Sequence, residues 1–359
     1  MARGACGYCT AMRLRRSDCT GPGIRRRRQG RGWSYLDADG ERVGDDEVLD
    51  RIDELAIPPA WQDVWICPYP GGHIQATGVD RRGRKQYLYH QRWRERQDQR
   101  KFDDMVAFAR ALPEARALID EHIAGRELSR EHVLACAVRL LDRGLFRIGT
   151  EDYAVTNETY GLATIRKRHV TVSGDTLVFD YPAKHSKRHI RQVVDPEVAA
   201  IVAKLKARRG GIDELLAYKR DGRWVDVRSA DINAYLKLAT GLDVSAKDFR
   251  TWGATVLAAV TLAASRPASF SAARRKRLVS HAVKEVSRFL GNTPAVARAS
   301  YIDPRVFDRF RDGVVIDVDV LADDPGTALQ GAVEEAVLAL ITGESVRRSP
   351  MLERERAAA

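Results

Sequence analysis

Long hydrophobic runs and a disulfide framework are both missing from this sequence. No stretch approaches the roughly 18 apolar residues that a membrane-spanning helix needs, and residues 1–20 lack the apolar segment of a secretion signal. The five cysteines are odd in number and scattered, which is typical of a reduced intracellular protein. Cys6 and Cys9 have the spacing of zinc ligands, but no clear second pair supports a metal site. We therefore expect a cytoplasmic protein without a membrane or metal association.

Acidic residues are too few to balance the basic ones. The 359 residues include 60 Lys and Arg against 49 Asp and Glu, which leaves a net charge of +11. Such an excess favours a polyanionic partner, and nucleic acid before a membrane surface. The sequence also contains no Walker loop, no Gly-x-Ser-x-Gly motif and no internal repeat.

The chain divides into four predicted segments. Residues 1–31 form a basic, irregular arm, with eight arginines and one acid between Arg13 and Arg31. It is either a disordered segment or an arm that lies along phosphates, and it can be both if it orders on binding. Residues 32–95 form a small β-rich domain, and residues 96–343 form a larger, mainly α-helical domain that contains three short strands. Residues 344–359 form a flexible tail. The predicted fold class is therefore α+β.

A basic hairpin is the clearest feature of the small domain. Strands are predicted at 73–78 and 85–89, joined by a polar turn. Aromatic and amide side chains alternate there with cations, a mixture that suits contact with DNA grooves and phosphates. The alternative is an ordinary hairpin whose tyrosines pack beneath it. The candidate DNA contacts are Arg81, Arg82, Arg84, Lys85, Gln86, Tyr87 and Tyr89.

The larger domain is predicted from its helical period. Strands at 169–172, 176–181 and 188–191 lie between helices, so that Lys184 falls on the tip of a hairpin. Pro113 is expected to interrupt one helical stretch or to open a new helix. The predicted helices are 102–112, 113–124, 129–143, 157–164, 195–207, 212–219, 229–240, 245–264, 282–290, 304–312 and 328–342.

The stretch 289–301 organises the candidate chemistry. A helix is expected to end at Gly291, Asn292 or Thr293 to cap the next helix, and that short helix to carry Tyr301. Taken alone, this pattern favours a helix–turn–helix joint with a tyrosine that packs. Basic residues elsewhere change that interpretation, because a tyrosine that attacks a phosphodiester needs cations around it.

Three such cations stand out. Arg147 lies between Phe146 and Ile148, a position unusual for arginine unless its guanidinium reaches a partner. Lys247 and Arg250 lie one turn apart on one face of a predicted helix. Guanidiniums can bind phosphate through two donors at once and lower the pKa of a phenol, which is ordinarily ~10.

These motifs, taken in order, resemble those of the small type IB DNA topoisomerases found in poxviruses and some bacteria. The resemblance covers most of the chain from about residue 13 and implies a clamp around duplex DNA. Its N-terminal motifs are 57–61 and 83–89, and its catalytic motifs are 146–149, 157–159, 247–253 and 291–301.

The resemblance also implies a role for each residue. Tyr301 would be the nucleophile that forms a 3′-phosphotyrosyl intermediate, with Arg147 and Arg250 on the phosphate. Lys184 would protonate the leaving oxygen, helped by Lys247, and Lys187 is the fallback for Lys184. Asn292 stands where most relatives carry His; Asn can donate a hydrogen bond but cannot carry charge or move a proton.

The expected activity is relaxation of positive and negative supercoils by nicking and resealing one strand, without ATP, metal or any other cofactor. The expected protein is a monomer in the nucleoid of the bacterial cytoplasm, with supercoiled duplex DNA as its partner. A tyrosine recombinase is the first alternative, although recombinases usually carry His where this chain has Lys247. A non-catalytic DNA-binding protein is the second, because basic charge and helices would fit it equally.

Overall fold

The structure is a computed structural model that describes residues 13–125, 128–265, 271–317 and 330–344. The chain separates into two compact units, residues 1–101 and residues 102–359, which are described one at a time. Cys6 and Cys9, and the predicted tail from residue 345 onward, lie outside the described residues.

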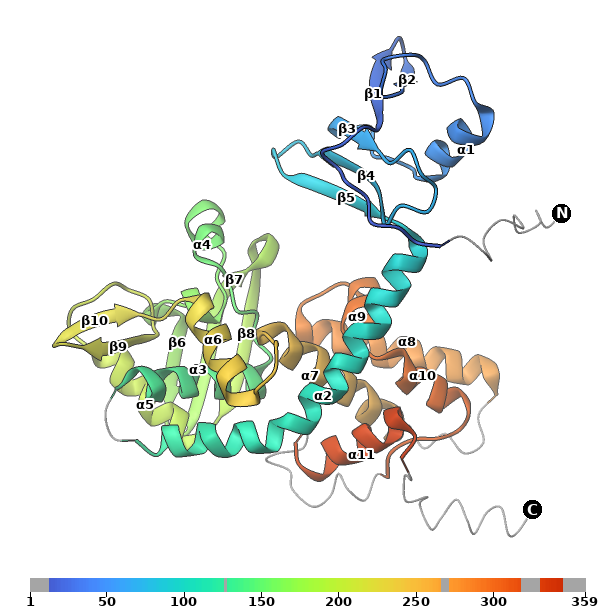
Figure 1. Ribbon diagram of the computed structural model, residues 1–359. Helices are drawn as coiled ribbons and strands as arrows, with labels where there is room; N and C mark the ends of the chain where they lie inside the picture. The colour runs from blue at the N-terminus through green and yellow to red at the C-terminus, as the bar shows by residue number, and fades with distance from the viewer. Residues whose placement is uncertain (1–12, 126–127, 266–270, 318–329, 345–359) are drawn as a thin grey trace, which may run out of the picture. The chain divides into compact units, whose positions relative to one another are not determined.

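The first unit contains a five-stranded antiparallel sheet and the short helix α1 (Asp46–Glu54) (Figure 1). The strand order is β2-β1-β3-β4-β5. The apolar core beneath the sheet includes Ile24, Val64, Ile66 and Ala76 of the strands and Ile52 of the helix. The strands are β1 (Ile24–Gln29), β2 (Gly32–Leu36), β3 (Gln62–Ile66), β4 (Ile74–Val79) and β5 (Lys85–Tyr89).

Strand β1 corrects the prediction of a basic arm over residues 1–31. Its run of arginines pairs along its whole length with β2 and at its start with β3. The guanidinium of Arg26 donates to the carbonyl oxygens of Ile57, Pro58 and Trp61 and lies 4.1 Å from the ring centroid of Trp33. An arginine can lie in a strand when its N–H groups donate to carbonyls and its charge lies over an aromatic ring. Positive charge alone therefore does not predict an irregular arm.

The second unit is mainly helical and contains a three-stranded antiparallel sheet, β6-β7-β8, and a separate hairpin, β9-β10. The long helix α2 (Gln91–Ile123) begins in the first unit and continues into the second. The strands are β6 (Val170–Ser173), β7 (Thr176–Ala183), β8 (Lys187–Val194), β9 (Ala217–Arg220) and β10 (Arg223–Asp226).

The central helix of this unit is α7 (Ala246–Ala263), which is buried along most of its length. Its Phe249 meets Phe108 of α2 edge to face at 5.0 Å, and Phe146 just after α3 meets Phe179 of β7 at 4.7 Å. The first contact joins α7 to α2, and the second joins the end of α3 to the three-stranded sheet. The other helices are α3 (Arg130–Gly144), α4 (Glu151–Asn157), η1 (Leu162–Thr164), η2 (Lys167–His169), η3 (Lys184–Ser186), α5 (Pro196–Ala207), α6 (Ser229–Thr240), α8 (Ala272–Leu290), α9 (Pro294–Ser300), α10 (Pro304–Arg311) and α11 (Ala332–Thr342).

Two predictions in this unit were wrong. Pro113 lies inside one continuous helix, because the buried face formed by Phe108, Leu112 and Ile119 continues across it and offsets the roughly 3 kcal/mol that an interior proline costs. The predicted helix 212–219 contains instead the start of β9. The pair Asp221 and Gly222, both with positive φ, forms the two-residue turn of a hairpin.

Two helix boundaries also differ from the prediction. Helix α8 begins at Ala272 rather than near residue 282, with Ser271 as its N-cap. The stretch 157–164 is not one helix: α4 ends at Asn157, Glu158 is left-handed, and a short 3₁₀ turn follows. Within the described residues, no helix is long and apolar enough to cross a membrane.

Candidate active site

The segment that leads to Tyr301 is a turn after α8 followed by the short helix α9, as predicted. Helix α8 ends at Gly291, whose φ of +63° is the left-handed conformation that glycine adopts most easily. The amide of Asn292 donates back to the carbonyl of Ser287 at 2.9 Å. Thr293, not Asn292, caps α9, because its side chain accepts from the amide of Val296. Tyr301 is the residue at which α9 ends.

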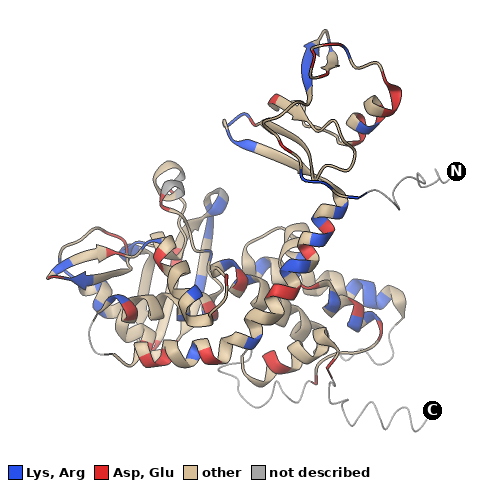
Figure 2. Cartoon of the chain, in the orientation of Figure 1, with Lys and Arg blue, Asp and Glu red and all other residues tan. Residues whose placement is uncertain are grey.

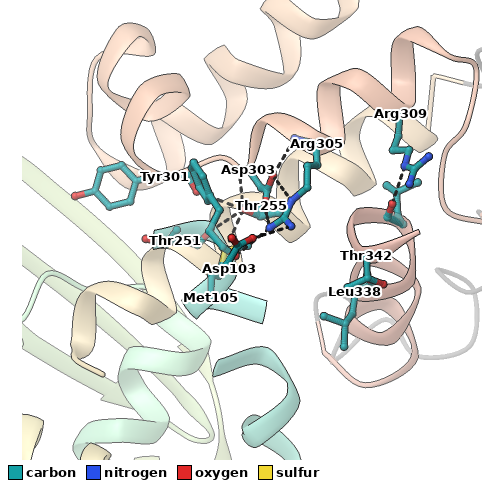
Figure 3. A network of polar contacts seen from close by, with 12 residues as sticks. Asp103, Met105, Thr251, Thr255, Tyr301, Asp303, Arg305, Arg309, Leu338 and Thr342 are labelled. Atoms are coloured by element: carbon teal, nitrogen blue, oxygen red, sulfur yellow. Dashed lines mark hydrogen bonds and ion pairs between the residues drawn. The ribbon is translucent and has the colours of Figure 1, made fainter. Parts of the chain in front are cut away.

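A buried polar network holds the backbone next to Tyr301 (Figure 3). Thr255 of α7 donates to the carbonyl of Tyr301 at 3.4 Å and accepts from the amide of Asp303 at 3.1 Å. Asp303 is fully buried and pairs through both oxygens with Arg305, which also reaches Asp103 of α2 at 3.2 Å. The ring of Tyr301 points away from this network, so the main chain is fixed while the phenol stays half-buried at the site.

Arg147 and Arg250 meet at the end of α8 and bind main-chain carbonyls there. Arg250 is buried and donates to Leu145 and, at 2.9 Å, to Leu290. Arg147 donates at 2.8 Å to Gly291. Carbonyls in the last turn of a helix have no partner within the helix and carry a partial negative charge, which suits them to hold guanidiniums. Among the described residues, no Asp or Glu pairs with either arginine.

Asn292 lies beside Arg147. Its Oδ1 accepts from the Arg147 guanidinium, which assigns the other end of the amide, Nδ2, as a donor. Within the described chain, this Nδ2 is buried and has no hydrogen-bond partner. An unpartnered buried donor beside two guanidiniums is suited to an anionic ligand.

The charges around Tyr301 favour the phenolate. Burial opposes ionisation, but the positive charges of Arg250, Lys247 and Arg147 outweigh it, so the pKa of Tyr301 lies below its ordinary value. The Arg250 guanidinium lies 5.4 Å from the centre of the phenol ring. Burial, and after it the charge of Arg147, lowers the pKa of Arg250 to about 10, which leaves it charged at neutral pH. A phenol in these surroundings can act as a nucleophile.

The two lysines of the prediction lie in different places. Lys247 is exposed on the first turn of α7, near enough for its charge to act on Tyr301. Lys184 is exposed at the tip of the β7–β8 hairpin, on η3, and in the described chain it makes no polar contact with the residues around Tyr301. Lys187 is also exposed and begins β8.

Sequence analysis missed two residues at this site. His189 and Arg191 lie on the inner face of β8, opposite Tyr181 and Phe179 of β7. Arg191 is buried, donates to the carbonyl of Phe289 at the end of α8, and stacks at 3.8 Å on the Phe289 ring. The signal was present: alternation along a strand that follows Lys184 puts 189 and 191 on one face.

The predicted DNA-contact hairpin is formed by β4 and β5, and its residues fall into two groups. Lys85, Tyr87 and Tyr89 alternate on the exposed face of β5, where the two rings stack at 6.1 Å. By contrast, Arg84 in the turn and Gln86 in β5 both donate to Asp80, so their side chains already have a partner within the hairpin. Arg81 and Arg82 are exposed in that turn, and Figure 2 shows the concentration of Lys and Arg there.

Family models match both parts of the chain. Residues 90–312 match the model described as "Eukaryotic DNA topoisomerase I, catalytic core". Residues 32–80 match "Bacterial DNA topoisomerase IB, N-terminal domain". The first match includes Arg147, Arg250, Asn292 and Tyr301, and the second ends just before the exposed turn of the hairpin.

Individual relatives agree with the family models. The chain is 26% identical over 310 residues to DNA topoisomerase 1B of Acanthamoeba polyphaga mimivirus, an alignment that covers 84% of this chain and 92% of that protein. It is 21% identical over 243 residues to DNA topoisomerase 1B of vaccinia virus (strain Copenhagen), covering 67% and 74%. DNA topoisomerase I of monkeypox virus matches to the same extent.

Proposed function

This chain belongs to the type IB DNA topoisomerases, and on that premise we propose that it relaxes DNA supercoils of both signs through a transient nick in one strand. The observation that carries the proposal is the surroundings of Tyr301. Its phenol has a lowered pKa and lies among Arg250, Lys247 and Arg147, while the described residues offer these arginines no carboxylate partner. A site of this kind is suited to a tyrosine that attacks a phosphodiester.

The proposed cleavage step exchanges one phosphoester bond for another. The Tyr301 oxygen loses its proton to solvent and bonds to phosphorus, while the bond from phosphorus to the 5′ oxygen breaks. The product is a 3′-phosphotyrosyl ester and a 5′ hydroxyl, whose proton comes from Lys184. Arg147, Arg250 and Asn292 donate to the non-bridging oxygens, where charge increases in the transition state.

The proposed religation step is the reverse. Because the phosphotyrosyl ester keeps the energy of the broken phosphodiester, resealing needs no ATP. Rotation of the free 5′ end between the two steps removes supercoils of either sign. Guanidiniums and lysines supply the charge stabilisation that metal ions supply in other phosphoryl-transfer sites.

The remaining parts of the proposal concern DNA binding. The exposed face of β5, with Lys85, Tyr87 and Tyr89, contacts the duplex together with Arg81 and Arg82. Alternating cations and aromatic rings support this assignment. We further propose that the protein acts as a monomer that closes around duplex DNA, and that it works on the chromosome in the nucleoid.

The test is a plasmid relaxation assay without ATP and with EDTA, run on both negatively and positively supercoiled DNA. We expect relaxation of both by the wild-type protein, and neither relaxation nor a covalent DNA adduct with Tyr301→Phe. The variant should retain DNA affinity, because only the attacking oxygen is removed. Recombined products would favour a tyrosine recombinase, and binding without cleavage would favour a non-catalytic protein.

A further inference from the structure

His189 faces Gly291, in the turn that contains Asn292 and to which Arg147 is bonded. It is on the inner face of β8, with its ring 5.5 Å from that of Tyr181. A Cβ atom built on Gly291 would lie 3.3 Å from His189 Cδ2 and 3.5 Å from both His189 Nε2 and Arg147 Nη1. Because Gly291 has no side chain, the ring of His189 and the guanidinium of Arg147 face the same small space.

The polar atoms of this imidazole are poorly satisfied. Nε2 has one long contact, 3.5 Å to Nη2 of Arg191. Nδ1 is buried and has no hydrogen-bond partner among the described residues. Arginine can only donate, so in the free protein Nε2 is the acceptor and Nδ1 carries the hydrogen. A contact of 3.5 Å is at the limit of a hydrogen bond, so Nε2 can exchange it for a better partner when a ligand is present.

We propose that His189 is a further catalytic residue, which donates a hydrogen bond from Nε2 to a non-bridging oxygen of the scissile phosphodiester beside Gly291. This inference rests on the proposed strand cleavage at Tyr301. It supplies, from β8, the imidazole donor that Asn292 cannot supply from the end of α8.

The charges around His189 make its protonation depend on the substrate. The groups facing the ring are Arg191 on its own strand, Tyr181 of β7, Arg147 after α3 and Arg250 of α7. Burial, followed by the charges of the three arginines, lowers the pKa of His189 to about 4. Burial also raises the pKa of Tyr181 to about 12, so that phenol is neutral.

The imidazole is therefore neutral at pH 7 in the free protein. A phosphodiester brings a negative charge among the guanidiniums, which offsets their repulsion and raises the pKa of His189. A proton taken from solvent then resides on Nε2, the atom that faces the phosphate. The alternative is that His189 only packs against Tyr181, in which case DNA does not change its protonation.

The first experiment reads this protonation without relying on catalysis. Full-length Tyr301→Phe protein with ¹³C-labelled histidine is titrated with pH by NMR, alone and with saturating duplex oligonucleotide. The His189 resonance is assigned by its loss in Tyr301→Phe/His189→Gln. We expect its pKa to rise by about two to three units on DNA binding, into the pH range of the assay. An unchanged pKa with DNA bound would overturn the inference.

The second experiment measures single-turnover formation of the covalent adduct between pH 5.5 and 8.5. His189→Phe keeps the ring and its packing but removes the donor, so we expect a rate about 10²-fold below wild type. His189→Gln keeps a neutral donor, so its deficit should be largest at low pH and shrink as pH rises. Ile190→Gln, on the outer face of the same strand, is the matched control and should cleave like wild type.

These outcomes separate the inference from the proposed function. If the wild-type protein forms no covalent adduct but the pKa of His189 still rises on DNA binding, the proposed strand cleavage is wrong and the contact between His189 and phosphate is supported. If the wild-type protein forms the adduct and His189→Phe forms it at the same rate, strand cleavage is supported and only the role of His189 is wrong.

Discussion

The two ends of the Asn292 amide have different surroundings, and each leads to a testable prediction. Oδ1 accepts from Arg147, while Nδ2 is a buried donor with no partner in the described chain. We expect Asn292→Ala to slow adduct formation less than Arg250→Ala, because a neutral donor contributes about half as much as a charged one. For Arg250→Ala the expected loss is ~10²–10³ or more.

The matched changes at this position are Asp and His. Asn292→Asp has the same shape but places a carboxylate against Arg147 and the phosphate, and should cleave more slowly than Asn292→Ala. Asn292→His should retain activity or gain it, since a protonated imidazole can donate a charge-assisted bond. Because Thr293 caps α9, these variants should unfold near the wild-type temperature. An Ala variant as impaired as Arg250→Ala would contradict the neutral-donor role.

Lys247 acts on Tyr301 through charge at a distance. Its positive charge is one of those that lower the pKa of the phenol, after that of Arg250. In Lys247→Met that pKa should rise towards its ordinary value of ~10. Because the cleavage rate grows with the phenolate fraction, the rising limb of the pH–rate profile should move to higher pH. A pH–rate profile of single-turnover cleavage checks this, and an unshifted limb with a lower plateau would assign Lys247 to proton transfer instead.

At the scale of the element, the end of α8 holds three guanidiniums on successive carbonyls: Arg191 on Phe289, Arg250 on Leu290 and Arg147 on Gly291. Gly291→Ala keeps these carbonyls but strains a left-handed residue, at a cost of about 1–2 kcal/mol, and fills the space beside His189. We expect a modest fall in melting temperature and a much larger fall in cleavage rate.

The control for that variant is Gly241→Ala at the end of α6. Gly241 has a φ of +67°, close to that of Gly291, but a Cβ there meets nothing within 4 Å. The backbone cost should be the same, and the cleavage rate should stay at the wild-type level. Equal rates for the two variants would show that the space beside Gly291 is not used.

The β4–β5 hairpin allows a similar comparison between neighbouring cations. Lys85 is exposed beside Tyr87, whereas Arg84 is already bonded to Asp80. We expect Lys85→Ala to weaken duplex binding and to reduce the slope of log K against log salt by ~0.9. Arg84→Ala should change the slope less. Fluorescence anisotropy at several salt concentrations measures both slopes. If the slope of Lys85→Ala equals that of the wild type, the hairpin is not part of the DNA interface.

Sequence patterns predicted the elements whose signals are local. Gly291 ends α8, Pro294 opens α9, and the hairpins around Ser173 and Lys184 follow from alternation and turn residues. The failures have tertiary causes. Arg26 in β1 donates to the carbonyls of Pro58 and Trp61, which lie 32 and 35 residues further along the sequence. Pro113 is tolerated because burial continues on both sides of it.

The site divides in the same way. Arg147 and Arg250 were singled out because each breaks a local rule: one is an arginine between apolar residues, and the other belongs to a charged pair on one helix face. Tyr301 was assigned because those cations and the resemblance of the motif 291–301 outweighed a packing role. His189 and Arg191 break no such rule. Their importance depends on β8 lying next to the end of α8, a long-range contact that no short window of sequence contains.

At the scale of the whole molecule, the two compact units have separate apolar cores. All the candidate catalytic residues lie in the second unit, and the candidate DNA contacts of the hairpin lie in the first. We expect a protein limited to residues 91–359 to fold and to form the Tyr301 adduct, with weaker and less salt-dependent DNA binding. Circular dichroism and adduct formation at saturating DNA check this, and loss of folding would show that the cores are interdependent.

The arginines at the end of α8 bind carbonyls, and the described residues give them no internal counterion. Dissolved anions would therefore act as competitors of DNA and not only as screening salt. Two buffers of equal ionic strength, one of chloride and one of sulfate, would give different cleavage rates, with the tetrahedral dianion the stronger inhibitor. In a cell, small phosphates would then compete with DNA for this site.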